Sequence, residues 1–345
     1  MMKITVPGNL LLLGEYAVTE EGGCGIAAAI GPRLTVSVEP ASELEITGLW
    51  ADERVHWNVR EILSYREAED GGELVPNVVR HVADELSEYG AHLADTSGHI
   101  IIDSSSFFSP EGRKRGYGSS AAVASGLTVV LFSLASTGTR TTPRHLYLTA
   151  LGAHRAAQGG RGSGYDVAAS LFGGMGFFTG GALPSWFELQ PQWQPDLILY
   201  PGQNAVKTAP SVTGYRRWAE EDPNRRADFL TASNHAVEEF AFAADWREAV
   251  SAGTRAKRLG VELGDLIGVP ARLDLPSGLS TLVMESAGHI PQGHPDILYK
   301  AVGAGDELGV LMTPPSWALA EAVDSSEGEA FVAAHIETEG VVWDS

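Results

Sequence analysis

The 345-residue sequence has a single cysteine, Cys24, and no apolar run that approaches the roughly 20 residues of a membrane span. One cysteine excludes an internal disulfide and the paired cysteines of zinc and redox motifs, so we interpret Cys24 as a small buried apolar residue. The first residues, Met1 to Pro7, lack the long apolar core of a secretory signal peptide. These absences predict a cytoplasmic protein with no membrane partner.

Basic residues are also scarce. The chain has 24 Lys and Arg against 44 Asp and Glu, which gives a formal net charge of −20. Such a surface argues against general nucleic-acid binding, which depends on basic side chains that displace counterions from phosphates. An anionic ligand would therefore need a locally basic site, and Arg113, Lys114 and Arg115 provide one such cluster.

A loop rich in glycine and serine follows this basic cluster directly. It reads Gly-Tyr-Gly-Ser-Ser-Ala-Ala over residues 116–122 and lacks the lysine of a Walker-type phosphate loop. Apolar residues then recur at spacings of three and four, which predicts a helix that starts near Ser120 and has one apolar stripe: Val123, Leu127, Val130, Leu131 and Leu134. The unpaired N–H groups at the start of such a helix favour a phosphate ligand. A plain turn followed by a serine cap explains the same residues.

Three further segments have motifs of their own. Residues 6–18 read Val-Pro-Gly-Asn-Leu-Leu-Leu-Leu-Gly-Glu-Tyr-Ala-Val, and residues 303–310 read Gly-Ala-Gly-Asp-Glu-Leu-Gly-Val. The longest, residues 153–170, reads Ala-His-Arg-Ala-Ala-Gln-Gly-Gly-Arg-Gly-Ser-Gly-Tyr-Asp-Val-Ala-Ala-Ser. In sequence and in order along the chain, the four segments resemble the motifs of the GHMP kinase superfamily of small-molecule kinases. The likeness is strongest to the phosphomevalonate kinases, because of the long third motif and because Tyr16 stands where mevalonate kinases usually have His.

The resemblance implies a two-lobed α+β fold, in agreement with the segregation of strand-like and helix-like patterns along the chain. We expect a nucleotide-binding N-terminal domain over residues 1–184, similar to domain 2 of ribosomal protein S5, and a ferredoxin-like C-terminal domain over residues 185–345. The crossing between them is expected in the segment 173–195, which is rich in Gly and Pro. The resemblance places the active site in the cleft between the lobes.

The implied function is an ATP-dependent kinase that converts 5-phosphomevalonate to 5-diphosphomevalonate in the mevalonate route to isoprenoids. Mevalonate kinase, another kinase or decarboxylase of the superfamily, and a homologue that binds nucleotide or metabolite without turnover are the alternatives. The expected ligands are ATP, Mg²⁺ and a small anionic hydroxy acid or phosphate. Relatives are often dimers, but no motif in this chain specifies a homodimer.

Two residues are predicted to take part in catalysis. The resemblance assigns Asp166 as the acceptor of the proton from the attacking oxygen, and its place at the start of a helix favours the ionised carboxylate. A plain helix cap is the alternative for Asp166. Asn9 stands where the superfamily usually has a lysine, and an amide offers hydrogen bonds without charge. This difference motivates the alternative without turnover.

The resemblance assigns nucleotide and metal ligands to the first glycine loop and its surroundings. Ser120 is the expected Mg²⁺ ligand, with Gln158 as a second, although Gln158 is equally well explained as a structural hydrogen-bonding residue. Mg²⁺ needs few protein ligands because it keeps several waters and binds phosphate oxygens. The residues expected to bind ATP phosphates are Arg115, Gly116, Tyr117, Gly118, Ser119, Ser120 and Ala121.

The substrate that receives the phosphoryl group, called the acceptor below, is expected to contact Lys207 and residues of the segments 6–18, 153–170 and 303–310. For Tyr16 the alternative is a core aromatic residue whose hydroxyl is hydrogen-bonded. Asp306 and Glu307 depart from the further glycines of the superfamily motif, and carboxylates there would repel a phosphate. The predicted substrate residues are Glu15, Tyr16, Ser163, Gly164, Lys207, Gly303, Ala304 and Gly305.

Hydrophobic periodicity predicts the other elements. Strands are expected around residues 4–6, 34–38, 100–102 and 281–284. Helices are expected over residues 78–89, 145–158 and 225–248, with a short one after Asp166.

Overall fold

The computed structural model describes residues 2–51, 53–64, 72–109, 111–135, 141–202, 208–287, 296–303, 305, 308–325 and 331–344. The chain divides into two compact units, each assembled from separate stretches. Unit 1 comprises Met1–Leu10, Ala29–Gly174 and Glu337–Ser345, and unit 2 comprises Leu11–Ala28 and Met175–Ile336. Strands β1 (Met2–Leu13) and β2 (Cys24–Glu39) therefore contribute residues to both units. The expected domain boundary after residue 184 stays a prediction.

Unit 1 contains a sheet in the order β12-β1-β2-β5-β3-β4. Its further strands are β3 (Leu44–Trp50), β4 (Glu53–Asn58), β5 (Gly98–Asp103) and β12 (Val342–Trp343). Strand β3 runs parallel to β5 and antiparallel to β4. In β5 the buried and partly exposed residues alternate, so that Ile100 and Ile102 face the core, as the period of two of a half-covered strand requires. The strands predicted from residues 4–6, 34–38 and 100–102 are confirmed.

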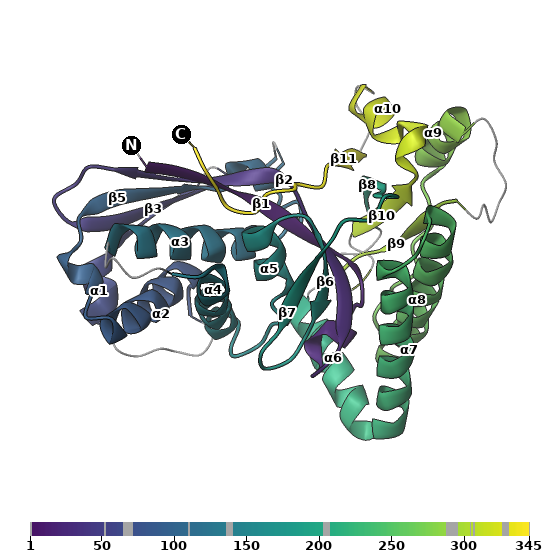
Figure 1. The fold of residues 1–345 in the computed structure, drawn as a ribbon, viewed down its shortest axis with the longest axis horizontal. Helices are drawn as coiled ribbons and strands as arrows, with labels where there is room; N and C mark the ends of the chain where they lie inside the picture. The colour runs from purple at the N-terminus through teal and green to yellow at the C-terminus, as the bar shows by residue number, and fades with distance from the viewer. Residues whose placement is uncertain are drawn as a thin grey trace. The chain divides into compact units, whose positions relative to one another are not determined.

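Helices cover one face of this sheet (Figure 1). They are α1 (Val59–Ser64), α2 (Leu74–Glu88), α3 (Ser119–Ala135), α4 (Pro143–Ala157) and α5 (Tyr165–Phe172). Helix α3 lies at the centre: it contacts α2, α4 and α5, and Gly126 packs against Val6 and Val36 of the sheet. The prediction that α3 has a single apolar stripe is therefore wrong, because partners on several sides bury almost every residue from Ser119 to Leu131.

Unit 2 contains a four-stranded antiparallel sheet in the order β11-β8-β10-β9. The strands are β8 (Asp196–Pro201), β9 (Leu298–Ala301), β10 (Leu308–Thr313) and β11 (Val332–Ala334). Helices separate β8 from β9 and β10 from β11, which gives the β-α-β-β-α-β order of a ferredoxin-like sheet with an enlarged first connection. The predicted α+β class and ferredoxin-like C-terminal lobe are confirmed. Its core includes Ile198, Tyr200 and Leu311 of the sheet, packed with Leu279 and Leu319 of the helices.

The helices of unit 2 correct two expectations. They are α6 (Thr208–Glu221), α7 (Pro223–Ala241), α8 (Trp246–Ile267), α9 (Ser277–Ala287) and α10 (Leu319–Ser325). The single helix predicted over residues 225–248 is two, because the Asp245 side chain accepts a hydrogen bond from Glu248 N at 2.9 Å and starts a new helix there. The predicted strand 281–284 lies inside α9, where Leu279 and Val283, one turn apart, are both buried in the core.

Segment 173–195 contains a hairpin rather than only a connection. Strands β6 (Met175–Thr179) and β7 (Ser185–Leu189) pair with each other, and β6 also pairs with residues Cys24–Ala28 of β2. Short 3₁₀ helices complete the chain at Ala17–Thr19, Leu93–Asp95, Ser105–Phe107 and Pro315–Trp317. Among the helices of the described ranges we find no candidate for a transmembrane span.

Candidate active site

The predicted phosphate loop lies at the N-terminus of α3 in unit 1. Gly116 and Gly118 have φ values of 79° and 73°, a left-handed conformation that favours glycine. Between them Tyr117 is buried, and its carbonyl oxygen accepts a hydrogen bond from Asn9 N at 3.0 Å. The first helical bond runs from Ala122 N to Gly118 O at 3.2 Å, which leaves the amides of residues 119–121 outside the helical ladder. These amides are the donors that a phosphate would use.

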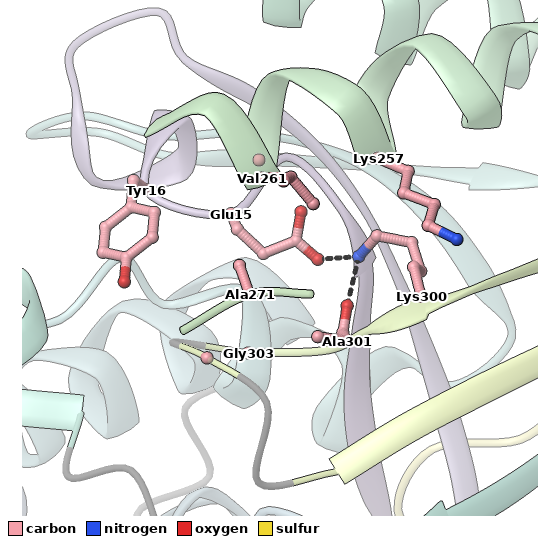
Figure 2. A pocket seen from close by; sticks show the side chains of 10 residues that line it. Glu15, Tyr16, Lys257, Val261, Ala271, Lys300, Ala301 and Gly303 are labelled. Atoms are coloured by element: carbon pink, nitrogen blue, oxygen red, sulfur yellow. Dashed lines mark hydrogen bonds and ion pairs between the residues drawn. The ribbon is translucent and has the colours of Figure 1, made fainter. Parts of the chain in front are cut away.

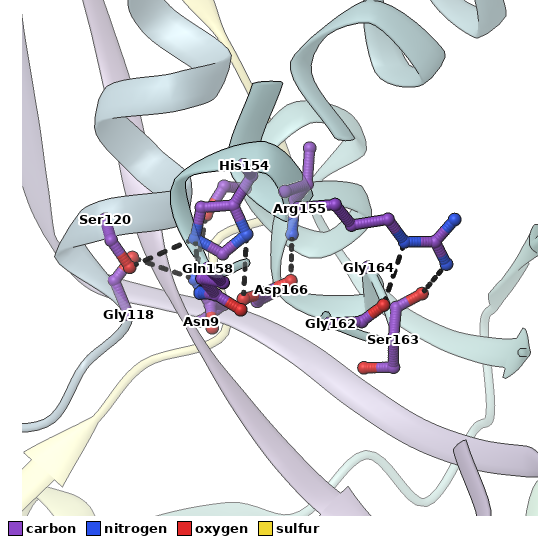
Figure 3. Close-up of polar contacts among 12 residues, drawn as sticks. Asn9, Gly118, Ser120, His154, Arg155, Gln158, Gly162, Ser163, Gly164 and Asp166 are labelled. Carbon is purple, nitrogen blue, oxygen red and sulfur yellow. Dashed lines mark hydrogen bonds and ion pairs between the residues drawn. The ribbon is translucent and has the colours of Figure 1, made fainter. Parts of the chain in front are cut away.

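Asn9 fastens this loop to the rest of unit 1 (Figure 3). Its side chain is buried, and Nδ2 donates to Gly118 O at 3.2 Å and to Ser170 Oγ at 3.0 Å. A Cβ atom on Gly118 would lie 2.1 Å from Asn9 Nδ2, so glycine is required there by space as well as by φ. The amide thus joins β1, the loop and α5 without adding a positive charge.

A buried histidine links the other predicted residues. His154, in the last turn of α4, is 1% exposed, and its Nε2 lies 3.2 Å from Ser120 Oγ and 3.1 Å from Gln158 Nε2. On the other edge of the ring, Nδ1 lies 3.7 Å from Asp166 Oδ2. Figure 3 shows the ring between the two expected metal ligands and the expected proton acceptor.

Asp166 stands in the first turn of α5. Its Oδ1 accepts a hydrogen bond from Val167 N at 2.9 Å, while its side chain is 23% exposed. Gly164, with φ 98°, caps this helix, and its carbonyl oxygen accepts a bond from the Tyr147 hydroxyl at 3.3 Å. Burial raises the pKa of Tyr147, and the nearby charge of Asp166 raises it further, so that the phenol remains a neutral donor.

Arg155 supports the loop before Asp166. Its Nε donates to Gly162 O at 2.9 Å, and its second terminal nitrogen donates to Ser163 O at 3.1 Å. In the glycine loop before α3, burial raises the pKa of the Tyr117 hydroxyl. The charge of Arg115 and a hydrogen bond with its side chain lower the same pKa. Both loops are therefore held in shape by side chains of unit 1.

A separate pocket lies in unit 2 (Figure 2). It is lined by Glu15, Tyr16, Lys257, Lys300 and Gly303, among others. Lys300 Nζ contacts Glu15 Oε1 and donates to Ala301 O at 2.7 Å, and both charged side chains are nearly buried. Burial lowers the pKa of Lys257 to about 8, and the positive charge of Lys300 adds to this effect.

Tyr16 belongs both to this pocket and to a small apolar cluster. Its ring lies 5.3 Å from that of Tyr215, in a cluster that also contains Ala219 and Leu263. Burial raises the pKa of Tyr16 to about 12, against the opposing effect of a hydrogen bond with Ser211. The hydroxyl is therefore a neutral hydrogen-bonding group at physiological pH.

The family model of the GHMP kinases N terminal domain matches residues 74–174, which include the glycine loop, His154 and Asp166. This segment therefore resembles a GHMP kinase N-terminal domain. Phosphomevalonate kinase from Streptomyces sp. (strain CL190) is 28% identical over 177 residues, which make up 49% of this chain and 46% of that protein. The match thus spans less than half the length of the curated relative.

Solved structures share the fold of the whole chain. The Lin0012 protein from Listeria innocua aligns with a TM-score of 0.76 at 21% identity, covering 99% of both chains. Phosphomevalonate kinase from Streptococcus pneumoniae, solved with phosphomevalonate and AMPPNP, aligns with a TM-score of 0.67 at 18% identity, covering 92% of this chain and 96% of that one. A mevalonate kinase and the galactokinase of Lactococcus lactis have the same fold at 15% and 14% identity. The chain therefore has the two-lobed GHMP kinase fold.

The structure gathers the predicted site residues into two groups. The first group is formed by β1 and the segment 74–174 and contains Asn9, Gly118, Ser120, Gln158 and Asp166. The second group lines the unit 2 pocket and contains Glu15, Tyr16, Gly303 and Gly305. Lys207, Ala304, Asp306 and Glu307 lie outside the described residues. The functional roles assigned to all of these residues stay predictions.

Several residues of these groups were not predicted from the sequence, among them His154, Ser170, Lys257 and Lys300. His154 and Gln158 are spaced i,i+4 on one helix, a spacing that places two side chains on the same face and could have revealed their contact. Lys300, three residues before Gly303, is a lysine in an acidic chain within a strand, and no local signal indicates that it is buried. Ser170 is the buried acceptor for Asn9. Across the described ranges, no three His, Cys, Asp or Glu side chains gather as a ready-made metal site.

Breaking the Lys300–Glu15 pair is expected to destabilise the protein strongly. Lys300→Met leaves the Glu15 carboxylate uncompensated in a site where the two side chains are 5% and 11% exposed. We expect a loss of about 3 kcal/mol in the free energy of unfolding, measured by urea denaturation. Lys300→Met combined with Glu15→Leu should recover most of the loss, because no buried charge remains. Equal losses in the single and double variants would contradict a buried ion pair.

Proposed function

We propose that this protein is an ATP-dependent kinase whose acceptor is 5-phosphomevalonate. One observation supports the activity above the others: a helix N-terminus whose first amides lie outside the helical ladder shares a site with Asp166, a partly exposed carboxylate that accepts a hydrogen bond at Oδ1. Phosphoryl transfer requires this combination of anion binding and a proton acceptor. The choice of acceptor is supported by the named likeness to phosphomevalonate kinases of Streptomyces and Streptococcus pneumoniae.

The first glycine loop is suited to the nucleotide phosphates. The amides of residues 119–121 lie at the N-terminal, positive end of the α3 dipole, and a Cβ atom on Gly116 would meet no atom within 4 Å. The Ser120 hydroxyl and the Gln158 side-chain oxygen are hard oxygen donors of the kind that Mg²⁺ prefers, so the residues fit an ion that takes most of its ligands from nucleotide and water. When bound, Mg²⁺ would neutralise charge on the phosphates.

The transfer itself makes one bond and breaks one. An oxygen of the acceptor attacks the γ-phosphorus of ATP, and the bond from that phosphorus to the β–γ bridging oxygen breaks with its electron pair leaving on ADP. A proton on the attacking oxygen passes to Asp166 Oδ2, the carboxylate oxygen that does not bind Val167 N. Asn9 and Ser170 hold the loop and α5 in register during this step.

Asn9 favours a second candidate, a homologue that binds nucleotide or metabolite without transfer. The superfamily resemblance places a lysine at this position, whereas the Asn9 amide donates to Gly118 O and Ser170 Oγ and supplies no charge. Within the described part of unit 1, no lysine takes part in the contacts of Asp166. Stabilisation of the negative charge on the transferring phosphoryl group would then depend on Mg²⁺ and the loop amides.

ADP release with separate acceptors tests both candidates. The protein is incubated with ATP, Mg²⁺ and either mevalonate, 5-phosphomevalonate, diphosphomevalonate or galactose, and products are identified by mass. Turnover on 5-phosphomevalonate that falls in Asp166→Asn is the expected result. Turnover on another acceptor alone would replace the proposed substrate. Binding of AMPPNP by calorimetry without turnover on any acceptor would favour the second candidate.

A further inference from the structure

The ring of His154 has an unsatisfied polar atom at the centre of the candidate active site. The side chain is 2% exposed, and Nδ1 is buried without a hydrogen-bond partner among the described residues. Its neighbour is Asp166 Oδ2, whose 3.7 Å separation is longer than a hydrogen bond. Buried polar atoms normally have partners, and an exception inside a catalytic cluster calls for a functional explanation.

Contacts on the opposite edge of the ring decide where its proton lies. The Gln158 amide nitrogen, 3.1 Å from Nε2, is a donor only, so Nε2 must accept its hydrogen. A neutral imidazole has one donor and one acceptor nitrogen, which places the hydrogen on Nδ1. Nδ1, the nitrogen that has this hydrogen, faces the Asp166 carboxylate (Figure 3). Ser120 Oγ, at 3.2 Å, shares the same Nε2 lone pair and keeps oxygen lone pairs for a ligand.

Among the described residues, the Asp166 carboxylate has a hydrogen bond at one of its two oxygens. Oδ1 accepts from Val167 N at 2.9 Å, whereas Oδ2 lies 3.7 Å from His154 Nδ1. Catalytic hydrogen bonds are often long in the absence of substrate and shorten when the site fills. A small rotation of the carboxylate about its own Oδ1 anchor would bring Oδ2 within reach of the His154 Nδ1 hydrogen.

We propose that His154 is a positioning residue: it donates its Nδ1 hydrogen to Asp166 Oδ2 when the substrates are bound and fixes the orientation of that carboxylate toward the attacking oxygen. This inference rests on the proposed function. His154 touches neither substrate and exchanges no proton with the acceptor. Nε2 of the same ring contacts Ser120 and Gln158, the two expected metal ligands. One side chain therefore positions both the expected proton acceptor and the expected metal ligands.

Three substitutions separate this role from packing. His154→Asn keeps an amide N–H near the position of Nδ1, His154→Gln places one near Nε2, and His154→Leu fills similar volume without polar atoms. At pH 5 we expect kcat to stay within about 2-fold of wild type in His154→Asn and to fall about 10-fold in the other two, the lower end of the range for residues that support active-site groups. The KM for ATP should change little in all three. His145→Asn, in the same helix and paired with Glu85 at 3.0 Å, is the matched control.

A packing role predicts a different pattern. His154→Leu would then retain more activity than His154→Asn, and kcat would follow the melting temperature of each variant. Either result would overturn the proposal. The ordering Asn above Gln and Leu at similar melting temperatures supports it.

The tautomer of His154 tests the contact without any turnover. Protein with ¹⁵N-labelled histidine is recorded at pH 8, with and without AMPPNP, and the signal of His154 among the 10 histidines is identified by its loss in His154→Asn. A hydrogen on Nδ1 is expected, and a hydrogen on Nε2 alone would overturn the inference. If the wild-type protein transfers no phosphate to any acceptor, the proposed function fails, whereas the tautomer still decides whether His154 faces Asp166 as a donor.

Discussion

Asp166→Asn is expected to lower kcat with 5-phosphomevalonate about 10-fold at pH 5, the most that loss of the general base can cost while about a tenth of the acceptor is already deprotonated. The asparagine keeps an oxygen that can accept the hydrogen bond from Val167 N, so the start of α5 should stay intact. It loses the ability to take a proton from the acceptor. The second pKa of a phosphate ester is near 6, so about nine tenths of the acceptor still has its proton at this pH. The measurement is steady-state ADP release at saturating ATP.

The pH dependence of the loss of kcat in Asp166→Asn shows whether proton transfer is its cause. At pH 8 a phosphate acceptor has already lost the proton, so the difference between Asp166→Asn and wild type should shrink; with a hydroxyl acceptor it should persist. Asp84→Asn, an exposed carboxylate on α2 of the same unit, is the matched control and should leave kcat unchanged. A kcat for Asp166→Asn within a factor of two of wild type at pH 5 would remove Asp166 from the mechanism.

Gly118→Ala is expected to destabilise the protein by about 3 kcal/mol and to weaken nucleotide binding. An added Cβ would meet three atoms of the Asn9 side chain at 2.1 to 2.4 Å. The left-handed backbone, with φ 73°, adds its own cost of about 1 kcal/mol for alanine. Overpacking of this kind costs about 1–3 kcal/mol more. The free energy of unfolding in urea and the KM for ATP are the two measurements.

Gly116→Ala provides the matched control for the stability measurement. Its φ of 79° is nearly the same, but no atom lies within 4 Å of an added Cβ, so only the backbone cost of about 1 kcal/mol is expected. In an Asn9→Ala background, Gly118→Ala should cost no more than Gly116→Ala, because the clashing atoms are gone. Equal costs for the two glycines in the wild-type background would show that contact with Asn9 does not constrain the loop.

Local patterns predicted many of the elements and several residues of the site. Helix α3 begins within one residue of its expected start, and α4 and β5 lie where their periodicities place them. Two predictions, the strand 281–284 and the single helix 225–248, are wrong because each segment contains two competing local signals. Thr281 to Met284 are rich in strand-favouring types, but the i,i+4 pair Leu279 and Val283 faces the core of a helix. Asp245 and Glu248 had the spacing of a helix start that divides α7 from α8.

By itself the sequence determined the type and the approximate position of most elements, the glycine loop with its following helix, and the likeness to the GHMP kinases, because periodicity, capping and turn chemistry act between near neighbours in the chain. Only the tertiary structure decided which side chains meet. Asn9 bonds to groups 109 and 161 residues away, and Lys300 pairs with Glu15 across 285 residues. The burial of His154 between Ser120 and Asp166 likewise depends on the packing of α3, α4 and α5. Such contacts follow from how strands and helices pack around a shared core, which no local pattern specifies.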